Sequence, residues 1–345
     1  MATIEFIPVD ENQRWESIVT GFPNYDVYYL NGYVRGFQLH GDGEPLLLYY
    51  HTEALRAIYV FMRRHTAIDG LYDAITPYGY GGVLFDGETS EENLRDFYAD
   101  YVTAMRGMHV VCNFVRYHPV LRNADPMRSL STVVDLGETI VMELRNEEVI
   151  WDNITSKHRN MIRKASKNGV SIHHAKDPEL FDNFRQIYNA TMDSDEADEY
   201  YYFKPGFYES IQRDLSEHYE MFYAVCDEKI IAMSIMLFAN GRLNYHLSGS
   251  DYEYRRVAPS NLLLYEAALW GCQQGMRTFH LGGGVGSGQD GLYKFKAGFN
   301  RNSDCRFSIG KEIFDQEGYD QLVQVCRKAR ADFDHSSTFF PIYRQ

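Results

Sequence analysis

The sequence predicts an α/β fold built on a mixed sheet. Alternating apolar runs predict strands at residues 221–227, 230–238 and 243–248, and the Asn240-Gly241 pair suits a type I′ hairpin turn. Apolar residues at helical spacing predict a helix over residues 259–274, and a short apolar strand follows at 278–281. A helix that leads directly into a strand is typical of an αβ unit.

Residues 278–299 read TFHLGGGVGSGQDGLYKFKAGF and contain the main candidate site. Six glycines lie between Gly282 and Gly291, and such a loop lets backbone N–H groups approach a ligand closely. The loop is not a P-loop, because its first lysine comes three residues after Gly291 and is followed by Phe295. The candidate substrate-binding residues here are Gly282, Gly283, Gly284, Tyr293 and Lys294.

A basic helix is predicted over residues 151–168, ending at Gly169. Arg159, Arg163 and Lys167 fall at i, i+4 and i+8 on one stripe, and the apolar residues lie on the opposite side. Repulsion between like charges on one stripe costs roughly a few tenths of a kcal/mol per pair. In an acidic chain this stripe favours a face that binds an anion.

The N-terminal half also alternates strands and helices. Residues 33–39 and 45–51, joined by a turn at 41–43, predict a hairpin that echoes residues 221–248 and indicates a degenerate duplication. Helices are predicted over residues 53–61 and 91–105, and a strand over 109–115. We expect an N-terminal domain over residues 1–130, a second domain over 131–312, and a C-terminal helix and tail over 313–345 that packs back on the first.

Composition excludes several functions. The formal charge of −14 argues against a general nucleic-acid-binding protein, DNA included, so local basic clusters must bind any anion. The five cysteines form no CxxC pair and are expected to be reduced thiols. The acidic-aromatic segment 193–202 lacks the glycine and terminal glutamate of an EF-hand, so we expect no metal there and assign Tyr202 to a substrate-binding wall. Neither a signal peptide nor a membrane span is expected.

Three blocks carry a resemblance to a known family: HRNMIRKASKNGV at residues 158–170, the strand-helix-strand core, and LGGG…LYKFKAGF. Together they resemble the Fem-type aminoacyltransferases, which build peptidoglycan interpeptide bridges on tandem GNAT-like domains. TPYGYGG at residues 76–82 and RYHPVLRN at 116–123 are similar to the N-terminal half of such proteins. This resemblance adds Tyr78, Tyr80 and Arg116 to the expected substrate-binding residues.

The resemblance implies an enzyme that forms an amide on an amine acceptor. The donor would be an aminoacyl-tRNA, and the acceptor a nucleotide- or lipid-linked cell-wall precursor in the cytoplasm or at the inner membrane face. Lys296, Tyr245 and His246 are the expected catalytic residues, and no cofactor is needed because the donor is a co-substrate. Direct transfer needs donors for a developing oxyanion but no nucleophilic side chain.

Two other functions remain open at this point. The first is an acyl-CoA-dependent GNAT N-acyltransferase that acts on an amino sugar or a polysaccharide precursor. The Q/RxxGxG/A pyrophosphate loop of such enzymes is not visible in residues 254–259. The second is a non-catalytic binding protein for nucleotide-linked precursors.

Overall fold

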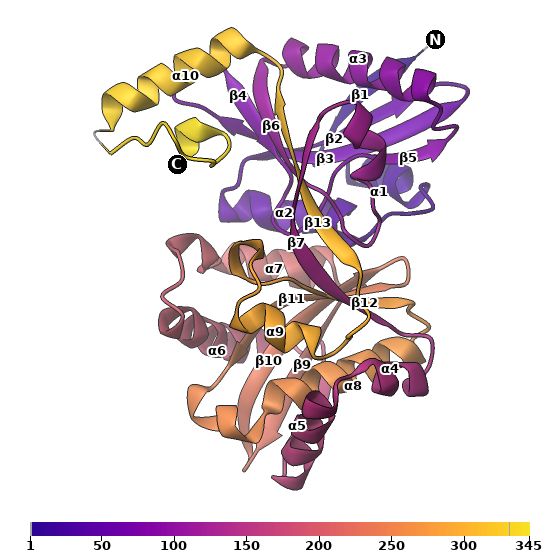
Figure 1. Ribbon diagram of the computed structural model, residues 1–345, viewed down its shortest axis with the longest axis vertical. Helices are drawn as coiled ribbons and strands as arrows, with labels where there is room; N and C mark the ends of the chain where they lie inside the picture. Colours follow the sequence, from indigo (N-terminus) through magenta and orange to yellow (C-terminus); the bar gives the residue numbers. More distant parts are fainter. Residues whose placement is uncertain (1, 331) are drawn as a thin grey trace. The chain divides into compact units, whose positions relative to one another are not determined.

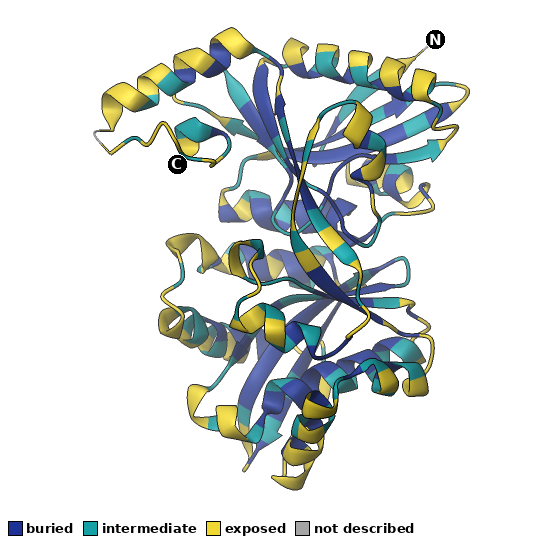
Figure 2. Ribbon diagram, in the orientation of Figure 1, coloured by how far each residue is buried: buried dark blue, intermediate teal, exposed yellow. Residues whose placement is uncertain are grey.

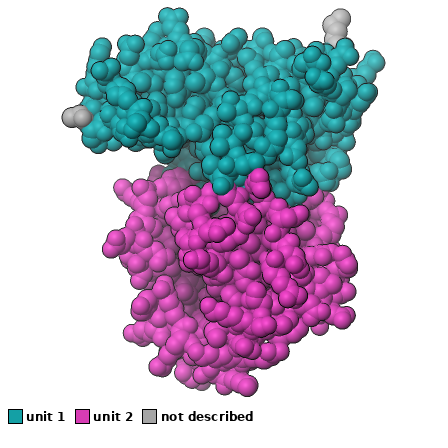
Figure 3. All heavy atoms as spheres, in the orientation of Figure 1, with its two compact units in different colours: residues 1–136, 307–345 teal, residues 137–306 magenta. Residues whose placement is uncertain are grey.

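The computed structural model describes residues 2–330 and 332–345, and the chain divides into two compact units (Figure 1, Figure 3). Unit 1 comprises Met1–Leu136 and Phe307–Gln345, and unit 2 comprises Gly137–Arg306. The chain passes from unit 1 to unit 2 within β7 (Thr132–Glu143) and returns within β13 (Cys305–Ile313). The domain boundaries expected at residues 130 and 312 stay a prediction.

Unit 1 is built on a sheet with the order β1-β2-β3-β4-β6-β13, and β5 pairs with β3. Its strands are β1 (Thr3–Pro8), β2 (Glu44–His51), β3 (Leu55–His65), β4 (Tyr72–Ile75), β5 (Leu84–Gly87) and β6 (Val110–Arg116). Its helices are α1 (Asn12–Thr20), α2 (Asn31–His40), α3 (Glu91–Gly107) and α10 (Gln316–Ala329).

Unit 2 is built on a sheet with the order β7-β12-β11-β10-β9-β8. Its further strands are β8 (Ser171–Ala175), β9 (Tyr219–Cys226), β10 (Lys229–Ala239), β11 (Arg242–Ser250) and β12 (Thr278–Gly282). Its helices are α4 (Glu147–Asn153), α5 (Ser156–Lys167), α6 (Leu180–Ser194), α7 (Pro205–Asp214), α8 (Pro259–Gln273) and α9 (Gly291–Ala297).

The two units repeat one topology. Unit 1 runs β1-α1-α2-β2-β3-β4-β5-α3-β6, and unit 2 runs β8-α6-α7-β9-β10-β11-α8-β12. In each sheet the strands pair antiparallel until one helix, α3 or α8, leads to a parallel neighbour. In the sheet, the parallel strand has an antiparallel neighbour on its other side, which is β13 in unit 1 and β7 in unit 2. The mixed α/β fold expected from the sequence is confirmed, and a duplication is visible in the strand order.

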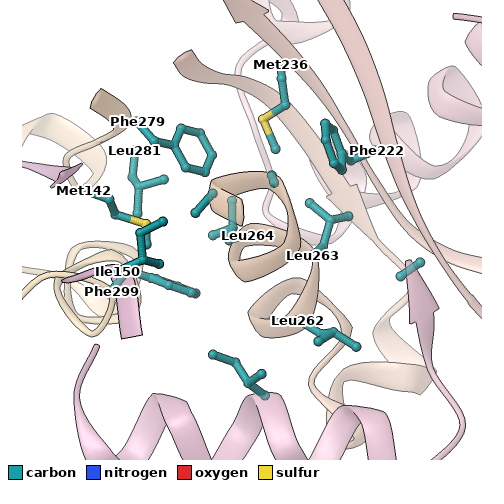
Figure 4. Packing of buried hydrophobic residues seen from close by; sticks show 14 of the residues in the cluster. Met142, Ile150, Phe222, Met236, Leu262, Leu263, Leu264, Phe279, Leu281 and Phe299 are labelled. Carbon is teal, nitrogen blue, oxygen red and sulfur yellow. The ribbon is translucent and has the colours of Figure 1, made fainter. Parts of the chain in front are cut away.

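Helices α6 and α8 cover opposite faces of the sheet of unit 2. The Phe222 ring contacts Trp270 of α8 at 5.5 Å, whereas the Tyr219 ring contacts Phe181 of α6 at 5.6 Å. Positions three apart on a strand point to opposite faces. Figure 4 shows the α8 side of this core, where Leu262, Leu263 and Leu264 lie among side chains of the sheet. Burying each leucine contributes about 2 kcal/mol.

Burial follows the same pattern in both units. The sheets are mostly buried, and the helices alternate between buried and exposed faces (Figure 2). In unit 1, α3 contributes Phe97 and Tyr101 to a core with Tyr59 and Phe61 of β3. A second, smaller cluster of unit 1 contains Val111 of β6 and Tyr319 and Leu322 of α10.

Three expectations about local structure were wrong. Residues 33–39 are part of helix α2, whose Tyr33, Val34 and Phe37 are buried at helical spacing and whose end is capped by Gly41 at φ +116°. Residues 53–61 lie mostly in strand β3, where pairing with β2, β4 and β5 outweighs helix propensity. The hairpin that corresponds to β9–β10 is therefore β2–β3, not residues 33–51.

The helix expected over residues 151–168 is two helices. Helix α4 ends at Asn153, Ile154 is extended at ψ 133°, and Thr155 caps the start of α5 with its side chain. The hydroxyl of Thr155 accepts a hydrogen bond from the His158 amide at 3.4 Å. A cap at Thr155 sets the start of the basic helix one turn later than the periodicity predicts.

Glu312 of β13 is a buried carboxyl group in the core of unit 1, at 4% exposure. Tyr101 and Asn113 each donate a hydrogen bond of 3.0 Å to its Oε2 atom. Tyr59 in turn donates to Asn113 Oδ1 at 2.8 Å. Burial raises the pKa of Glu312 to about 6, while the hydrogen bonds from Asn113 and Tyr101 oppose this shift.

We predict that Glu312→Gln stabilises the protein above pH 6. A raised folded-state pKa means that stability is fully present below the unfolded-state value and is lost as pH rises through about 6. The charged form then costs about 2 kcal/mol at neutral pH, which the amide removes. Urea unfolding at pH 5 and pH 8 measures the difference, and Glu53→Gln at an exposed loop position is the control. Equal pH slopes for wild type and Glu312→Gln would contradict this role.

Candidate active site

The parallel strands β11 and β12 separate in the middle of unit 2. Their pairing covers only Arg242, Leu243 and Asn244 of β11. Beyond this point β11 stays paired with β10 as far as Ser250, and β12 stays paired with β7 as far as Gly282. A register shift places His246 as an extra residue on β11, and a second shift does the same for Leu281 on β12. Bulges of this kind re-aim side chains beside active sites.

The glycine loop after β12 is compact, with its backbone folded against itself and against β7. A Cβ atom on Gly284 would collide with the Gly288 carbonyl oxygen and with Asp290 Oδ1. A Cβ atom on Gly283 would lie 2.9 Å from the Glu138 carbonyl oxygen of β7. Gly282 has φ +76°, which favours glycine. The glycines are therefore required by close packing of the loop itself.

Asp290 holds the loop to the start of helix α9. Its Oδ1 atom accepts a hydrogen bond from the Tyr293 amide at 2.8 Å, and its Oδ2 atom accepts one from the Val285 amide at 3.1 Å. These backbone hydrogen bonds, that of Tyr293 first, lower the pKa of Asp290. Asp290 was not among the residues expected from the sequence, although an Asp three positions before Tyr293 is a recognisable helix N-cap.

Lys296 is the buried cation of this site, at 9% exposure. Its ammonium group donates a 2.8 Å hydrogen bond to the Gly283 carbonyl oxygen and lies 5.9 Å from the centre of the Tyr245 ring. Burial lowers the pKa of Lys296 to about 8, and the charge of Asp290 opposes the shift. The ammonium form predominates at neutral pH, and the neutral form becomes substantial above pH 8.

Tyr245 and His246 lie on β11 where it leaves β12. The Tyr245 hydroxyl donates a 2.6 Å hydrogen bond to Ser248 Oγ, and burial raises its pKa. Burial lowers the pKa of His246 to about 3, so its imidazole is neutral at physiological pH, and its ring lies 6.4 Å from that of Phe207. An imidazole with so low a pKa is a weak base. The Tyr245 ring contacts the Lys296 ammonium group.

Tyr293 connects α9 to β7. Its hydroxyl donates a 2.5 Å hydrogen bond to Glu138 Oε2, and this bond raises the pKa of Tyr293. Lys294, on the neighbouring position, is exposed. The sequence offered no signal for Glu138, because the tertiary fold brings it to Tyr293 across 155 positions of the chain.

The basic helix α5 begins beside the end of α9. The Thr155 amide donates a 2.9 Å hydrogen bond to the Gly298 carbonyl oxygen. The His158 ring lies so close to Gly298 that a Cβ atom there would collide with it, and it packs 4.9 Å from the Phe299 ring. Burial lowers the pKa of His158. The start of α5 is thus held against Gly298, which lies two residues after Lys296 in the sequence.

Arg159 and Arg163 of α5 lie over the ring of Trp151, at 5.9 and 5.0 Å from its centre. Arg159 also donates a 3.3 Å hydrogen bond to the Trp151 carbonyl oxygen. Lys167, at the end of the helix, is exposed. The sequence predicted the three cations but not the tryptophan that orders two of them.

The remaining predicted residues lie elsewhere. Tyr202 lies between α6 and α7, and its hydroxyl donates a 2.6 Å hydrogen bond to Asp193 Oδ1. Tyr78, Tyr80 and Arg116 belong to unit 1. There the Tyr78 ring lies 5.8 Å from Phe37, the Tyr80 ring 5.7 Å from Tyr28, and the Arg116 guanidinium 5.7 Å from the Phe114 ring. Their role in substrate binding stays a prediction.

No group of three or more His, Cys, Asp or Glu side chains is placed to hold a metal ion among residues 2–330 and 332–345. Within the same part of the chain, no helix has the length and apolar character needed to cross a membrane.

Comparison with known proteins identifies the class to which this site belongs. Residues 154–296 match the family model described as Acetyltransferase (GNAT) domain. This match covers α5 to Lys296, and so includes the diverging strands and the glycine loop. The protein is therefore an enzyme with an acyltransferase domain of the GNAT type.

Solved structures extend this likeness to both units. FemX is 14% identical, with 92% of this chain and 99% of that chain covered and a TM-score of 0.68. L-PGS from Bacillus licheniformis is 13% identical, with 93% and 97% covered and a TM-score of 0.55. A tandem GNAT protein from the clavulanic acid biosynthesis pathway is 10% identical, with 90% and 99% covered and a TM-score of 0.52. No curated protein sequence matches the chain.

These likenesses confirm the expected tandem GNAT-like fold, and the chain is a Fem-like protein of the GNAT superfamily in its fold. Identities of 10 to 14% show the fold alone.

We predict that Gly284→Ala and Gly288→Ala have different effects. Both glycines have extended backbone, at φ −85° and −81°, that alanine adopts readily. At Gly284 the new Cβ atom collides with backbone of the loop, whereas at Gly288 its nearest neighbour is the Val285 carbonyl oxygen at 3.5 Å. Overpacking should lower the unfolding free energy of Gly284→Ala by about 1–3 kcal/mol and leave Gly288→Ala within about 1 kcal/mol of wild type. Thermal unfolding of the pair decides; equal effects would contradict a closed loop.

Proposed function

We propose that the chain transfers an aminoacyl group from aminoacyl-tRNA to an amine on a nucleotide- or lipid-linked cell-wall precursor. The observation that carries this proposal is the buried Lys296 ammonium beside Tyr245, at the point where β11 and β12 separate. Lys296 lies in the FKAGF block on which the resemblance to Fem-type proteins rests. The shared folds of FemX and L-PGS support an aminoacyl donor.

The proposed reaction is a direct transfer. The neutral amine nitrogen of the acceptor attacks the ester carbonyl carbon of the donor, a C–N bond forms, and the C–O bond to the ribose breaks. The amine loses a proton, and the leaving ribose oxygen gains one. No covalent enzyme intermediate and no cofactor are needed, because the donor already carries an activated ester.

In this reaction Lys296 would stabilise developing negative charge on oxygen. Its ammonium group already donates to one carbonyl oxygen, that of Gly283, in a mostly buried place. A charged donor in such a place stabilises an oxyanion more strongly than it would in water. The hydrogen bond to Gly283 holds the ammonium in position before substrate arrives.

The start of helix α8 argues against the acyl-CoA alternative. GNAT enzymes that use CoA offer successive backbone N–H groups to its pyrophosphate at this position. Here Pro259 has no N–H at the first helical position, and the Asn261 amide is bonded to the Ala258 carbonyl oxygen at 3.2 Å. The Ala258 amide is bonded to the Arg255 carbonyl oxygen at 3.1 Å. These amides are therefore not available to an anion.

We predict that Lys296→Ala lowers the rate of transfer about 100-fold or more and leaves the fold intact. Removal of one charged donor to a developing oxyanion has an effect of this size. Lys296→Arg should retain part of the activity, because its side chain stays positively charged. The measurement is turnover, with circular dichroism and thermal unfolding as checks of folding. Unchanged turnover in Lys296→Ala removes Lys296 from the site.

The pH dependence separates the two forms of Lys296. With its pKa near 8, the ammonium form is lost as pH rises through 8, while arginine stays charged. The ratio of wild-type rate to Lys296→Arg rate should therefore fall above pH 8, and titration of the substrates cancels in this ratio. A ratio that rises above pH 8 would instead assign Lys296 a role as a neutral base.

Ligand binding distinguishes the candidate functions. We predict that a UDP-linked muramyl pentapeptide raises the melting temperature of the purified protein and that acetyl-CoA does not. A ligand at 100 times its dissociation constant adds about 2.7 kcal/mol of stability. A shift with acetyl-CoA alone would support the acyl-CoA N-acyltransferase. A shift with the muramyl nucleotide but no transfer from any donor would support the non-catalytic binding protein.

A further inference from the structure

The exposed face of helix α5 carries only positive charge. Its charged residues are Lys157, Arg159, Arg163, Lys164 and Lys167, and the exposed uncharged residues of the helix are Ser156, Asn160 and Ser166. The other side of the helix is buried through Ile162 and Ala165. A chain with a formal charge of −14 thus concentrates five cations on one helix of 12 residues.

No ion pair neutralises this face within the described part of the chain. Before α5 in the sequence Arg145 forms an ion pair with Glu143, and after it His174 Nδ1 lies 2.8 Å from Glu220 Oε1. On α5 itself Arg159 and Arg163 lie over the Trp151 ring, and their hydrogen bonds go to Ser156 Oγ, Asn160 Oδ1 and the Trp151 carbonyl oxygen. Five like charges without a carboxylate partner repel each other, and an anion laid over them relieves that repulsion.

The length of the face favours an extended polyanion. Twelve helical residues span about 18 Å, and Lys157 and Lys164 are separated by about 10 Å along the axis. A single phosphate or pyrophosphate group is too short to contact all five cations. A phosphodiester backbone carries one negative charge on each nucleotide, so several charges fall within the length of this helix. Such a backbone binds rows of lysine and arginine.

Membrane docking is a weaker explanation for the same charges. A helix that binds at a membrane surface presents an apolar face to the lipid. The apolar residues of α5 are not available for this, because Ile162 and Ala165 are buried in the core that also contains Leu262 and Leu263 of α8. The face that remains is polar and basic throughout.

The position of the face relates it to the candidate active site. The cap residue Thr155 is bonded to the Gly298 carbonyl oxygen, and the His158 ring packs against the Phe295 and Phe299 rings of the α9 segment. The cationic row therefore begins beside the segment that carries Lys296. A strand of nucleic acid that follows α5 toward its N-terminus ends near that lysine.

From these observations we propose that the basic face of α5, formed by Lys157, Arg159, Arg163, Lys164 and Lys167, binds the phosphodiester backbone of the RNA that carries the acyl group. Trp151 holds two of the arginines in place, and the three lysines contact phosphates directly. This inference rests on the proposed function, since it takes the donor to be RNA-borne. It assigns to α5 the positioning of the RNA and to Lys296 the chemistry at its 3′ end.

The test compares two variants with equal loss of charge. The first replaces Lys157, Lys164 and Lys167 by glutamine. The control replaces Lys204, Arg327 and Lys328, which are exposed residues outside α5, by glutamine. Binding of a fluorescent RNA minihelix with a 3′ CCA end is measured by anisotropy over a range of salt concentrations. We expect the α5 variant to lose at least tenfold in affinity and its salt slope to fall by about 2 units, and the control to stay within twofold of wild type.

Kinetics with two donors separate this inference from the proposed function. The α5 variant should raise KM for the aminoacylated minihelix and leave KM for an aminoacylated CCA trinucleotide unchanged, because the trinucleotide lacks the stem that reaches α5. Suppose that the wild type turns over neither donor but binds RNA, and that the α5 variant loses this binding. This result would overturn the proposed function but not the RNA-binding face. Equal RNA affinity in wild type and the α5 variant, or equal losses in both variants, would overturn the RNA-binding face. So would loss of binding to phosphatidylglycerol vesicles in the α5 variant with no change in RNA binding.

Discussion

The site in unit 2 depends on one constraint of strand pairing: β12 leaves β11 but stays bonded to β7. Three residues of parallel pairing hold β11 and β12 together at one end, and bulges at His246 and Leu281 accompany their separation. The loop that continues β12 can then place the Gly283 carbonyl oxygen within reach of Lys296. The antiparallel pairing to β7 fixes the direction in which β12 departs.

Unit 1 repeats this topology but fills the corresponding place with its own chain. After β4 the Thr76 amide donates to the Phe114 carbonyl oxygen at 3.1 Å, and the Gly81 amide donates to the Arg116 carbonyl oxygen at 2.7 Å. Gly81 also forms a parallel bridge with Tyr117. The TPYGYGG segment is therefore bonded to β6 at Thr76 and, beyond its tyrosines, is bonded to the end of β6 again at Gly81. The two units thus differ where their parallel strands end. In unit 2 β11 and β12 separate, whereas in unit 1 the segment after β4 is bonded again to the end of β6.

Much of the fold of unit 2 could be predicted because its signals are local. The type I′ turn needs only Asn240 and Gly241, which adopt φ +46° and +72°, and the helix before β12 follows from its apolar spacing. Residues 33–39 and 53–61 were assigned wrongly because short apolar runs fit a strand and a helix equally well. Their state is decided by the Gly41 cap in one case and by sheet neighbours in the other.

The candidate site was predictable to the same extent. Lys296, Tyr293 and the glycines lie in one short stretch of sequence, and the structure groups them. Glu138 and Trp151 could not be predicted, because they reach their partners Tyr293 and Arg163 only through the tertiary fold. Residue types that can be catalytic are visible in a sequence, but hydrogen-bond partners from distant strands are not.

The crossing of the chain within β7 and β13 has a consequence for synthesis on the ribosome. Unit 2 is one continuous segment, Gly137–Arg306, whereas the sheet of unit 1 includes β13, which is made after all of unit 2. The first 136 residues therefore leave the ribosome with the strand β6 unpaired on the side that β13 later occupies. The unit that begins the chain is thus completed last, and the unit that carries the acyltransferase site can close its sheet first.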